Sequence, residues 1–231
     1  MSIVDSDFCL SGISNVDLER TAKRIIHLGC QIQLSELLVW NRNGQVNRTI
    51  FEEGTSIADM EGVIEFDFEV VIRFMCVLHP CLAGVRTTIN IAAYPAPNNI
   101  GTIIEGQLYL GHVLNKGISP ERTLNAFAEL LVVLAKRLDT IFLNVADEDD
   151  ESILLTGSGV RLPSLFGVYN YFLVEGLIEK LQKEGVVIDK SQNKELILIW
   201  VAPIAELIGD AGPRKAVLKV LRSHLANAGY D

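Results

Sequence analysis

Apolar and polar side chains alternate strictly between residues 64 and 70. A period of two places one set of side chains on one face of a β-strand and the other set on the opposite face. We therefore predict a strand with one buried face and one solvated face. The apolar set is Ile64, Phe66, Phe68 and Val70, and the acidic set between them is Glu65, Asp67 and Glu69.

Four further strand-like runs lie in the same half of the chain. Residues 31–39 and 45–51 flank Asn43-Gly44. Asn-Gly favours a two-stranded hairpin because both residues tolerate a positive φ. Residues 85–94 and 101–112 form the other two runs, and the proline-containing stretch between them predicts a loop.

Two helices have clear start signals. Ser14 and Asp17 precede an apolar stripe that ends near Gly29, which predicts a capped helix. Ser119-Pro120-Glu121 supplies a cap residue, a proline at the first helical position and an acid in the first turn. This second helix is expected to run to about Asp139 and to lead into a strand over residues 140–145.

Composition changes after residue 151. Residues 166–184 carry leucines at helical spacing, with Gly185 as a C-cap, and predict a helix. Residues 186–188 and 196–201 predict a second hairpin. A last helix is expected from Pro213 to just before Gly229.

These elements predict an α+β fold, in which helices flank an antiparallel sheet and a smaller helix–hairpin–helix unit follows. The predicted division places an α+β domain at residues 1–146 and the C-terminal unit at residues 152–231. The two parts either form separate domains or pack as one.

Bulk composition excludes some functions. The chain has 231 residues, of which 49% are hydrophobic, so core material is ample. A net charge of −9 disfavours binding to nucleic acid and to anionic membranes. No run of 18 apolar residues occurs, the N-terminus has no basic region typical of a secretory signal, and four cysteines fit reduced thiols. We therefore expect a cytoplasmic protein.

The acidic residues fall in two blocks. Residues 52–69 contain seven acids and no base, and five carboxylates follow one another at residues 147–151. The second block is a solvated turn, a docking surface for a basic partner or a site for a hard cation, although it lacks the spacing of an EF-hand loop. The candidate partner-binding residues are Glu65, Asp67, Glu69, Asp147, Glu148, Asp149, Asp150 and Glu151.

Two other groups have candidate chemistry. Cys76, His79 and Cys81, with His27 and Cys30 elsewhere, offer zinc ligands at a spacing that is not a standard one, and their apolar neighbours favour buried free cysteines instead. We predict no metal and no cofactor.

Residues 156–161 form a glycine-rich stretch that could hold an anion ahead of a helix, but it has no Walker lysine and no dinucleotide fingerprint. Ser158 lacks the context of a nucleophile elbow. His112 and His224 lie beside apolar residues and are interpreted as structural. We predict no catalytic residue.

The order of helix, hairpin, further antiparallel strands and capped helix resembles the YbjN / type III secretion chaperone-like family over residues 10–145. The resemblance implies a small, acidic, non-enzymatic and commonly dimeric protein, whose chaperone branch holds secretion substrates in extended form. The stretches that suggest it are Gly106-Gln107-Leu108-Tyr109-Leu110, Gly117-Ile118-Ser119-Pro120-Glu121-Arg122 and the leucine-rich helix ending at Arg137-Leu138-Asp139.

The segment Ile199-Trp200-Val201-Ala202-Pro203-Ile204, followed by a helix, resembles bacterial suppressor-of-fused-like proteins. That resemblance implies an immunity role against toxins, which some of those proteins have.

These observations predict a non-enzymatic, acidic protein-binding module, either chaperone-like or regulatory. Its partner is expected to be another protein, basic or partly unfolded, and a homodimer is one form it could take. The first alternative is an immunity-type inhibitor of a toxin. The second is a small-molecule or metal-dependent enzyme that uses the Gly157–Gly159 loop and nearby acids.

Overall fold

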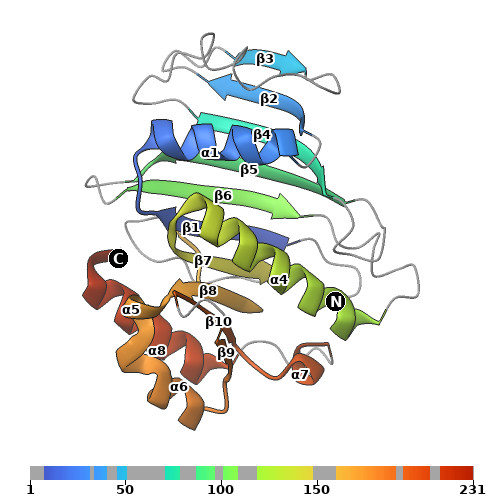
Figure 1. Ribbon diagram of the computed structural model, residues 1–231. Helices are drawn as coiled ribbons and strands as arrows, with labels where there is room; N and C mark the ends of the chain where they lie inside the picture. The colour runs from blue at the N-terminus through green and yellow to red at the C-terminus, as the bar shows by residue number, and fades with distance from the viewer. Residues whose placement is uncertain are drawn as a thin grey trace.

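The computed structural model describes residues 8–31, 34–40, 46–50, 71–78, 87–96, 101–108, 119–147, 160–190, 195–208 and 214–230. Within these residues the fold is α+β, as predicted, and it is built on one antiparallel sheet of ten strands (Figure 1). In sheet order the strands are β3 (Val46–Ile50), β2 (Leu34–Trp40), β4 (Val71–Leu78), β5 (Thr87–Pro95), β6 (Thr102–Leu108), β1 (Phe8–Ser14), β7 (Thr140–Asp147), β8 (Phe166–Asn170), β10 (Leu196–Trp200) and β9 (Val187–Lys190). Strands from both predicted parts of the chain belong to this sheet.

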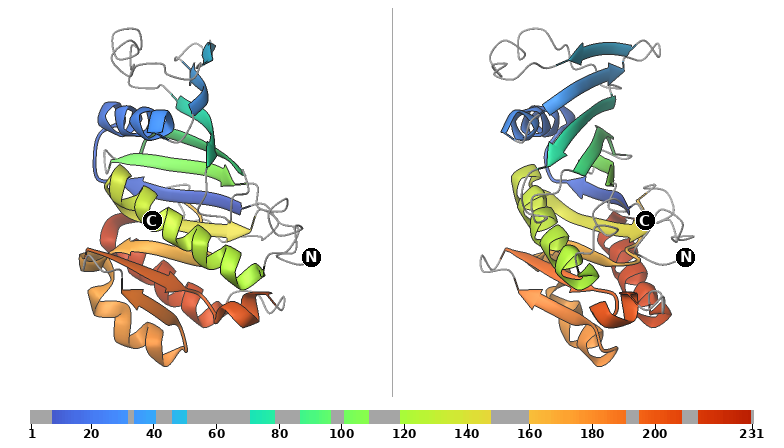
Figure 2. Two further views of the ribbon diagram at one scale, coloured as in Figure 1. Left: turned by 45° about the vertical axis from the view of Figure 1, so that its right-hand side comes forward. Right: turned by 90° about the vertical axis from the view of Figure 1, so that its right-hand side faces the viewer.

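Helices α1 (Leu18–Gln31) and α4 (Pro120–Leu138) lie on one face of the sheet (Figure 1). Near the C-terminal strands β8, β10 and β9, α8 (Lys215–Leu225) lies on the opposite face of the sheet (Figure 2). Between β8 and β9 the chain forms α5 (Tyr171–Val174), a 3-10 turn (Glu175–Leu177) and α6 (Ile178–Lys183), and α7 (Ile204–Ile208) follows β10.

The core on the α4 side is organised around aromatic rings. Phe127 of α4 packs against Phe8 of β1 and Phe166 of β8, with ring centroids 5.8 and 5.6 Å apart. Phe166 in turn contacts Trp200 of β10, and their ring centroids are 4.7 Å apart. Rings at such separations attract each other beyond the area they bury. One aromatic row therefore connects the middle of the sheet with its C-terminal strands.

The bounds of α4 agree with the sequence prediction, and Ser119 is the N-cap residue, but its side chain makes no capping hydrogen bond. Pro120 occupies the first turn and Glu121 supplies the acid there. At the other end Asp139 adopts a left-handed conformation with φ 54°, and its N–H donates to the carbonyl of Lys136. This left-handed residue ends the helix and turns the chain directly into β7.

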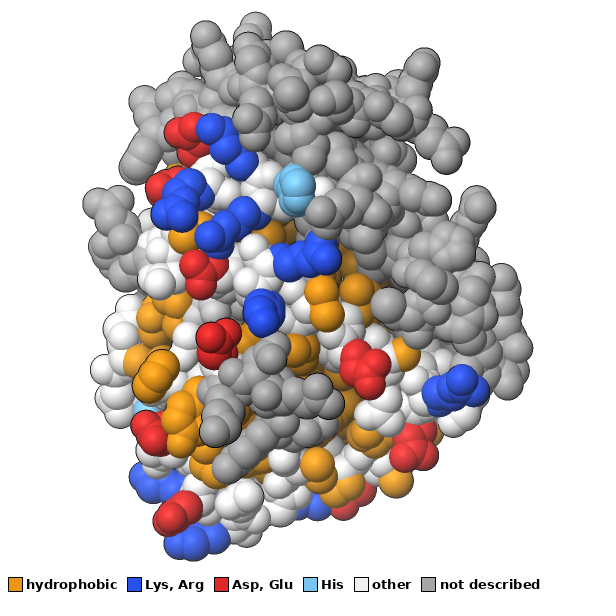
Figure 3. All heavy atoms as spheres, viewed as in Figure 1, with side chains coloured by type: hydrophobic (Ala, Val, Ile, Leu, Met, Phe, Trp, Pro, Cys, Tyr) orange, Lys and Arg blue, Asp and Glu red, His pale blue; other side chains and the backbone are white. Residues whose placement is uncertain are grey.

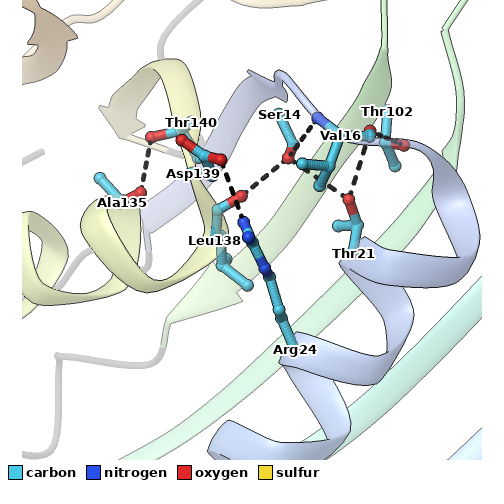
Figure 4. Close-up of polar contacts among 9 residues, drawn as sticks. All are labelled: Ser14, Val16, Thr21, Arg24, Thr102, Ala135, Leu138, Asp139 and Thr140. Atoms are coloured by element: carbon cyan, nitrogen blue, oxygen red, sulfur yellow. Dashed lines mark hydrogen bonds and ion pairs between the residues drawn. The ribbon is translucent and has the colours of Figure 1, made fainter.

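Polar contacts join α1, α4 and the sheet at one place (Figure 4). The buried Ser14 hydroxyl donates to the Leu138 carbonyl at 2.7 Å, and Thr102 Oγ1 donates to the Val16 carbonyl at 2.8 Å. Arg24 of α1 forms an ion pair of 3.3 Å with Asp139. These bonds satisfy the carbonyls of a helix end and a loop, so they explain how the two helices are held on the same face.

Both predicted hairpins are confirmed, since β2 pairs with β3 and β9 with β10. The prediction of a helix over residues 166–184 is wrong at its start. Phe166 to Asn170 is a strand, and the helix begins at Tyr171, where the Asn170 side chain accepts a hydrogen bond from the Phe172 N–H at 3.0 Å. Aromatic and β-branched residues in this stretch favour a strand, and pairing with β7 and β10 stabilises it.

Strands β1 and β4 and helix α7 were not predicted. β1 lies in the middle of the sheet, between β6 and β7. The predicted alternating strand at residues 64–70 lies outside the described residues.

Candidate functional site

The three neighbouring strands β5, β6 and β1 have two different faces. In the register of these strands, Phe8, Leu108 and Ile89 are opposite one another and belong to the face that carries the helices, where Phe8 packs against Phe127 of α4. One residue further along, Cys9, Gln107 and Asn90 are opposite one another and face away from it. Because side chains alternate along a strand, the second row belongs to the face that α1 and α4 do not cover. We call it the open face.

The open face contains a polar hollow. Its volume is about 370 Å³, and it lies over β5, β6 and β1 beside the segment that leads into β8. The polar groups of its lining residues are a negative carboxylate, a positive guanidinium, two amides, a hydroxyl and a thiol. The side chains that supply these groups are Glu105, Arg161, Asn90, Gln107, Ser11 and Cys9.

Glu105 is held by a neighbouring strand. The Tyr94 hydroxyl of β5 is hydrogen-bonded to the Glu105 carboxylate of β6. Burial raises the pKa of Tyr94 well above its ordinary value, and the hydrogen bond to Glu105 and the charge of that carboxylate raise it further. The tyrosine therefore stays protonated and donates to the carboxylate at every physiological pH.

Arg161 is positioned through its backbone. Its N–H donates to the Ser11 hydroxyl at 2.9 Å, and its carbonyl accepts from Asn144 Nδ2 at 2.8 Å. Asn144 is itself fixed, because its Oδ1 accepts a hydrogen bond of 2.6 Å from the fully buried Tyr169 hydroxyl. Burial raises the pKa of Tyr169 above its ordinary value, so this donor also stays protonated. Side chains of β1, β7 and β8 thus place Arg161 at the rim.

The side chains of the hollow are suited to binding. Among the described residues Glu105 and Arg161 form no ion pair with each other or with a third residue, so both charges can interact with a ligand. No described histidine lines the hollow. His27 is exposed on α1, and His224 of α8 contacts the Leu173 carbonyl through Nε2. The described lining therefore offers hydrogen bonds and one charge of each sign to a ligand.

Most of the candidate residues chosen from the sequence lie outside the described residues: Glu65, Asp67, Glu69, Glu148, Asp149, Asp150 and Glu151. Asp147 is described and ends β7, where it is opposite Phe8 and therefore on the α4 side of the sheet. Its N–H donates to the Ser164 hydroxyl at 2.8 Å. The structure does not place Asp147 beside the hollow.

The zinc candidates are also only partly described. His27 and Cys30 lie on α1 and Cys76 on β4, whereas His79 and Cys81 lie outside the described residues, as does the Gly157–Gly159 loop. In the described ranges no group of three histidine, cysteine, aspartate or glutamate residues could hold a metal ion.

Sequence reasoning missed the residues of the hollow. A signal was present in β6, where the polar side chains of Glu105 and Gln107 are two residues apart between buried Ile104 and Leu108. In β1, Cys9 and Ser11 likewise alternate with the buried residues Phe8 and Leu10. Each pattern predicts a strand with one polar face. The pairing of β1 with β6, which brings the two polar faces together, joins distant parts of the chain and has no local signal in the sequence.

In the part of the chain that the structure describes, no helix is both long and apolar enough to cross a membrane.

Comparison with known proteins identifies similar folds only. No family model matches the chain, and no curated protein sequence matches it significantly, so the resemblance to the YbjN / type III secretion chaperone-like family stays a prediction. A T6SS protein from Pseudomonas aeruginosa superposes with a TM-score of 0.51 at 13% identity, covering 95% of this chain and 75% of that one. At this identity the likeness concerns the fold.

A second similar structure is a chain from the complex of the toxic C-terminal tip of CdiA from Pseudomonas aeruginosa with an immune protein. Its TM-score is 0.40 at 10% identity, and the match covers 68% of this chain and 97% of that one.

Proposed function

We propose that this protein binds a partner protein through the open face of its sheet and acts as an immunity-type inhibitor of a toxin. The observation that supports the proposal is the polar hollow, in which Glu105 and Arg161 make no ion pair with described residues. Charges that are held in place before binding give specificity, because a partner must match both of them. The role requires no chemistry from the hollow.

The character of the described surface favours an inhibitor over a chaperone. A chaperone that holds an unfolded segment needs a continuous apolar surface. Only three large hydrophobic side chains of the described residues are exposed, and they lie on different elements: Val133 on α4, Phe172 on α5 and Val187 on β9. A polar hollow instead fits the folded surface of a toxin.

The partner is proposed to be basic. The chain has a net charge of −9, so the attraction of a cationic protein would raise the rate of association. Within the hollow, a basic side chain of the partner would bind Glu105, and an acidic group or a carbonyl beside it would bind Arg161.

The test begins with the products of neighbouring genes. Each would be purified and titrated against this protein by calorimetry, and its toxicity would be measured with and without co-expression of this chain. We expect one of them to bind at one-to-one stoichiometry and to lose its toxicity. If every such product fails to bind, or if the bound one stays toxic, the inhibitor role is wrong.

Two variants then test the hollow. Glu105→Gln and Arg161→Gln should each weaken binding by roughly tenfold or more, since each removes a charge from a confined interface. The matched controls are Glu121→Gln and Arg122→Gln, which remove an adjacent acid and base from the exposed start of α4. Equal affinities for all four variants would place the interface elsewhere.

A further inference from the structure

A second charged surface lies on the helix side of the sheet, away from the hollow. It consists of Arg20, Lys23 and Arg24 on α1 and of Lys136 and Arg137 in the last turn of α4. Figure 3 shows basic side chains gathered over α1 and the adjoining end of α4. We call this surface the basic helix face. Its sign is opposite to the net charge of −9.

Two of these cations already have acidic partners within the surface. Lys23 forms an ion pair of 2.8 Å with Glu19, and Arg24 one of 3.3 Å with Asp139. The exposed side chains of Arg20 and Lys136 form no ion pair with a described residue. The surface therefore keeps a local excess of positive charge that ion pairing within the described residues does not remove.

Helix stability accounts for only one part of this surface. Lys136 and Arg137 lie in the last turn of α4, where the helix dipole favours cations. Arg20 lies in the first turn of α1, where the same dipole disfavours a cation. The helix dipole therefore does not account for the position of Arg20.

We infer that the basic helix face binds a carboxylate-rich segment of a protein. Charge complementarity selects an anionic occupant. A nucleic acid or an anionic membrane would extend past the patch and meet the field of a chain with net charge −9. A short acidic segment can contact the patch alone. This surface would give the protein a second binding site, on the face opposite the proposed toxin site.

The experiment uses the full chain and a fluorescent decapeptide of glutamate, with the glutamine decapeptide as its uncharged control. Anisotropy titrations at low and at high salt would measure affinity. We expect binding of the glutamate peptide at low salt, its loss at high salt, and no binding of the glutamine peptide. The double variant Arg20→Gln/Lys136→Gln should bind roughly fivefold more weakly or worse.

The matched control is Lys180→Gln/Lys183→Gln, which removes the same charge from exposed positions on α6. Far-ultraviolet circular dichroism would verify that both variants are folded. Equal affinities of the two variants would overturn the inference. So would tighter binding of anionic lipid vesicles or a single-stranded oligonucleotide than of the peptide. No toxin is present in this assay, so its result is independent of the proposed inhibitor role.

Discussion

The two faces of the sheet at β5, β6 and β1 differ in character, although alternate residues of the same three strands form both of them. On the α4 side, Phe8, Leu108 and Ile89 are fully buried and belong to the main hydrophobic core. On the open face, the next positions carry Cys9, Gln107 and Asn90 around a hollow. A shift of one residue along the strand exchanges an apolar environment for a polar one.

This difference separates stability from recognition. The free energy of burial comes from the α4 side, where aliphatic and aromatic side chains leave water. The open face can then carry charges and amides at little cost, because the strands beneath it are already fixed. If this separation is correct, substitutions on the two faces should differ widely in their effect on unfolding.

The largest effect is expected for Phe127→Ala. Phe127 is fully buried and contacts the rings of Phe8 and Phe166. Its removal should lower the free energy of unfolding by about 3–5 kcal/mol, because apolar burial is lost and a cavity remains. Urea denaturation followed by tryptophan fluorescence measures this. Val133→Ala on the same helix, where Val133 is 47% exposed, should cost under about 1 kcal/mol. Similar losses for both would contradict the assignment of α4 to the core.

Tyr169→Phe should have the next largest effect. The hydroxyl is buried and donates to Asn144 at 2.6 Å, so its loss leaves a buried acceptor unsatisfied. The expected loss is about 1–3 kcal/mol near neutral pH. Urea denaturation again measures it, and Tyr171→Phe, which removes a hydroxyl from the surface, is the control. A loss as small as that of the control would mean that the bond to Asn144 does not support the segment of Arg161.

The pH dependence of the same variant has a definite sign. Burial raises the pKa of Tyr169 above its ordinary value of about 10 in the folded protein. Its contribution to stability is therefore complete below pH 10 and is lost as the pH rises above that value, because only the unfolded chain ionises there. Denaturation curves above pH 10 should show a narrowing gap between the wild type and Tyr169→Phe. A gap that widens would contradict a buried, neutral tyrosine.

The part of the fold that local signals determine could be predicted. Ser119, Pro120 and Glu121 identify the start of α4, and Asp17 caps α1 by accepting from the Arg20 N–H at 2.9 Å. Both hairpins follow from short connections between apolar runs. In each of these cases the interacting residues are near one another in the chain, so the sequence contains the signal.

The centre of the sheet and the candidate site could not be predicted in this way. β1 lies between β6 and β7. The residues with which it pairs follow it in the chain by 88 to 100 positions in β6 and by 126 to 139 positions in β7. Leu173, Leu177 and Leu181 predict a helix, and the prediction extends it back to residue 166, yet pairing with β7 and β10 makes residues 166–170 a strand. The hollow depends on both facts, since it combines β1 with β6, β5 and Arg161. Charge counting pointed instead to residues 65–69 and 147–151.

A smaller effect is expected for Arg24→Gln at the helix junction. The ion pair with Asp139 is partly exposed, with 55% of the Asp139 side chain accessible to solvent. Such pairs contribute about 0.2–1 kcal/mol, and salt weakens them. Thermal unfolding at low and high salt measures this, with Arg122→Gln as a control that has no ion pair among the described residues. A larger loss that persists at high salt would show that Arg24 acts through packing of its aliphatic part.

The smallest effect on stability is expected for Glu105→Gln, the substitution on the open face. The glutamine side chain keeps an oxygen that can accept the hydrogen bond of the Tyr94 hydroxyl, and it removes only the charge. Its free energy of unfolding should remain within about 0.5 kcal/mol of the wild type. Urea denaturation beside Glu129→Gln, on the exposed surface of α4, provides the comparison. If Glu105→Gln instead lost several kcal/mol, the hollow would be part of the structural core, and a loss of partner binding in this variant would report unfolding. A normal unfolding curve together with weakened binding would separate the two faces, one for stability and one for recognition.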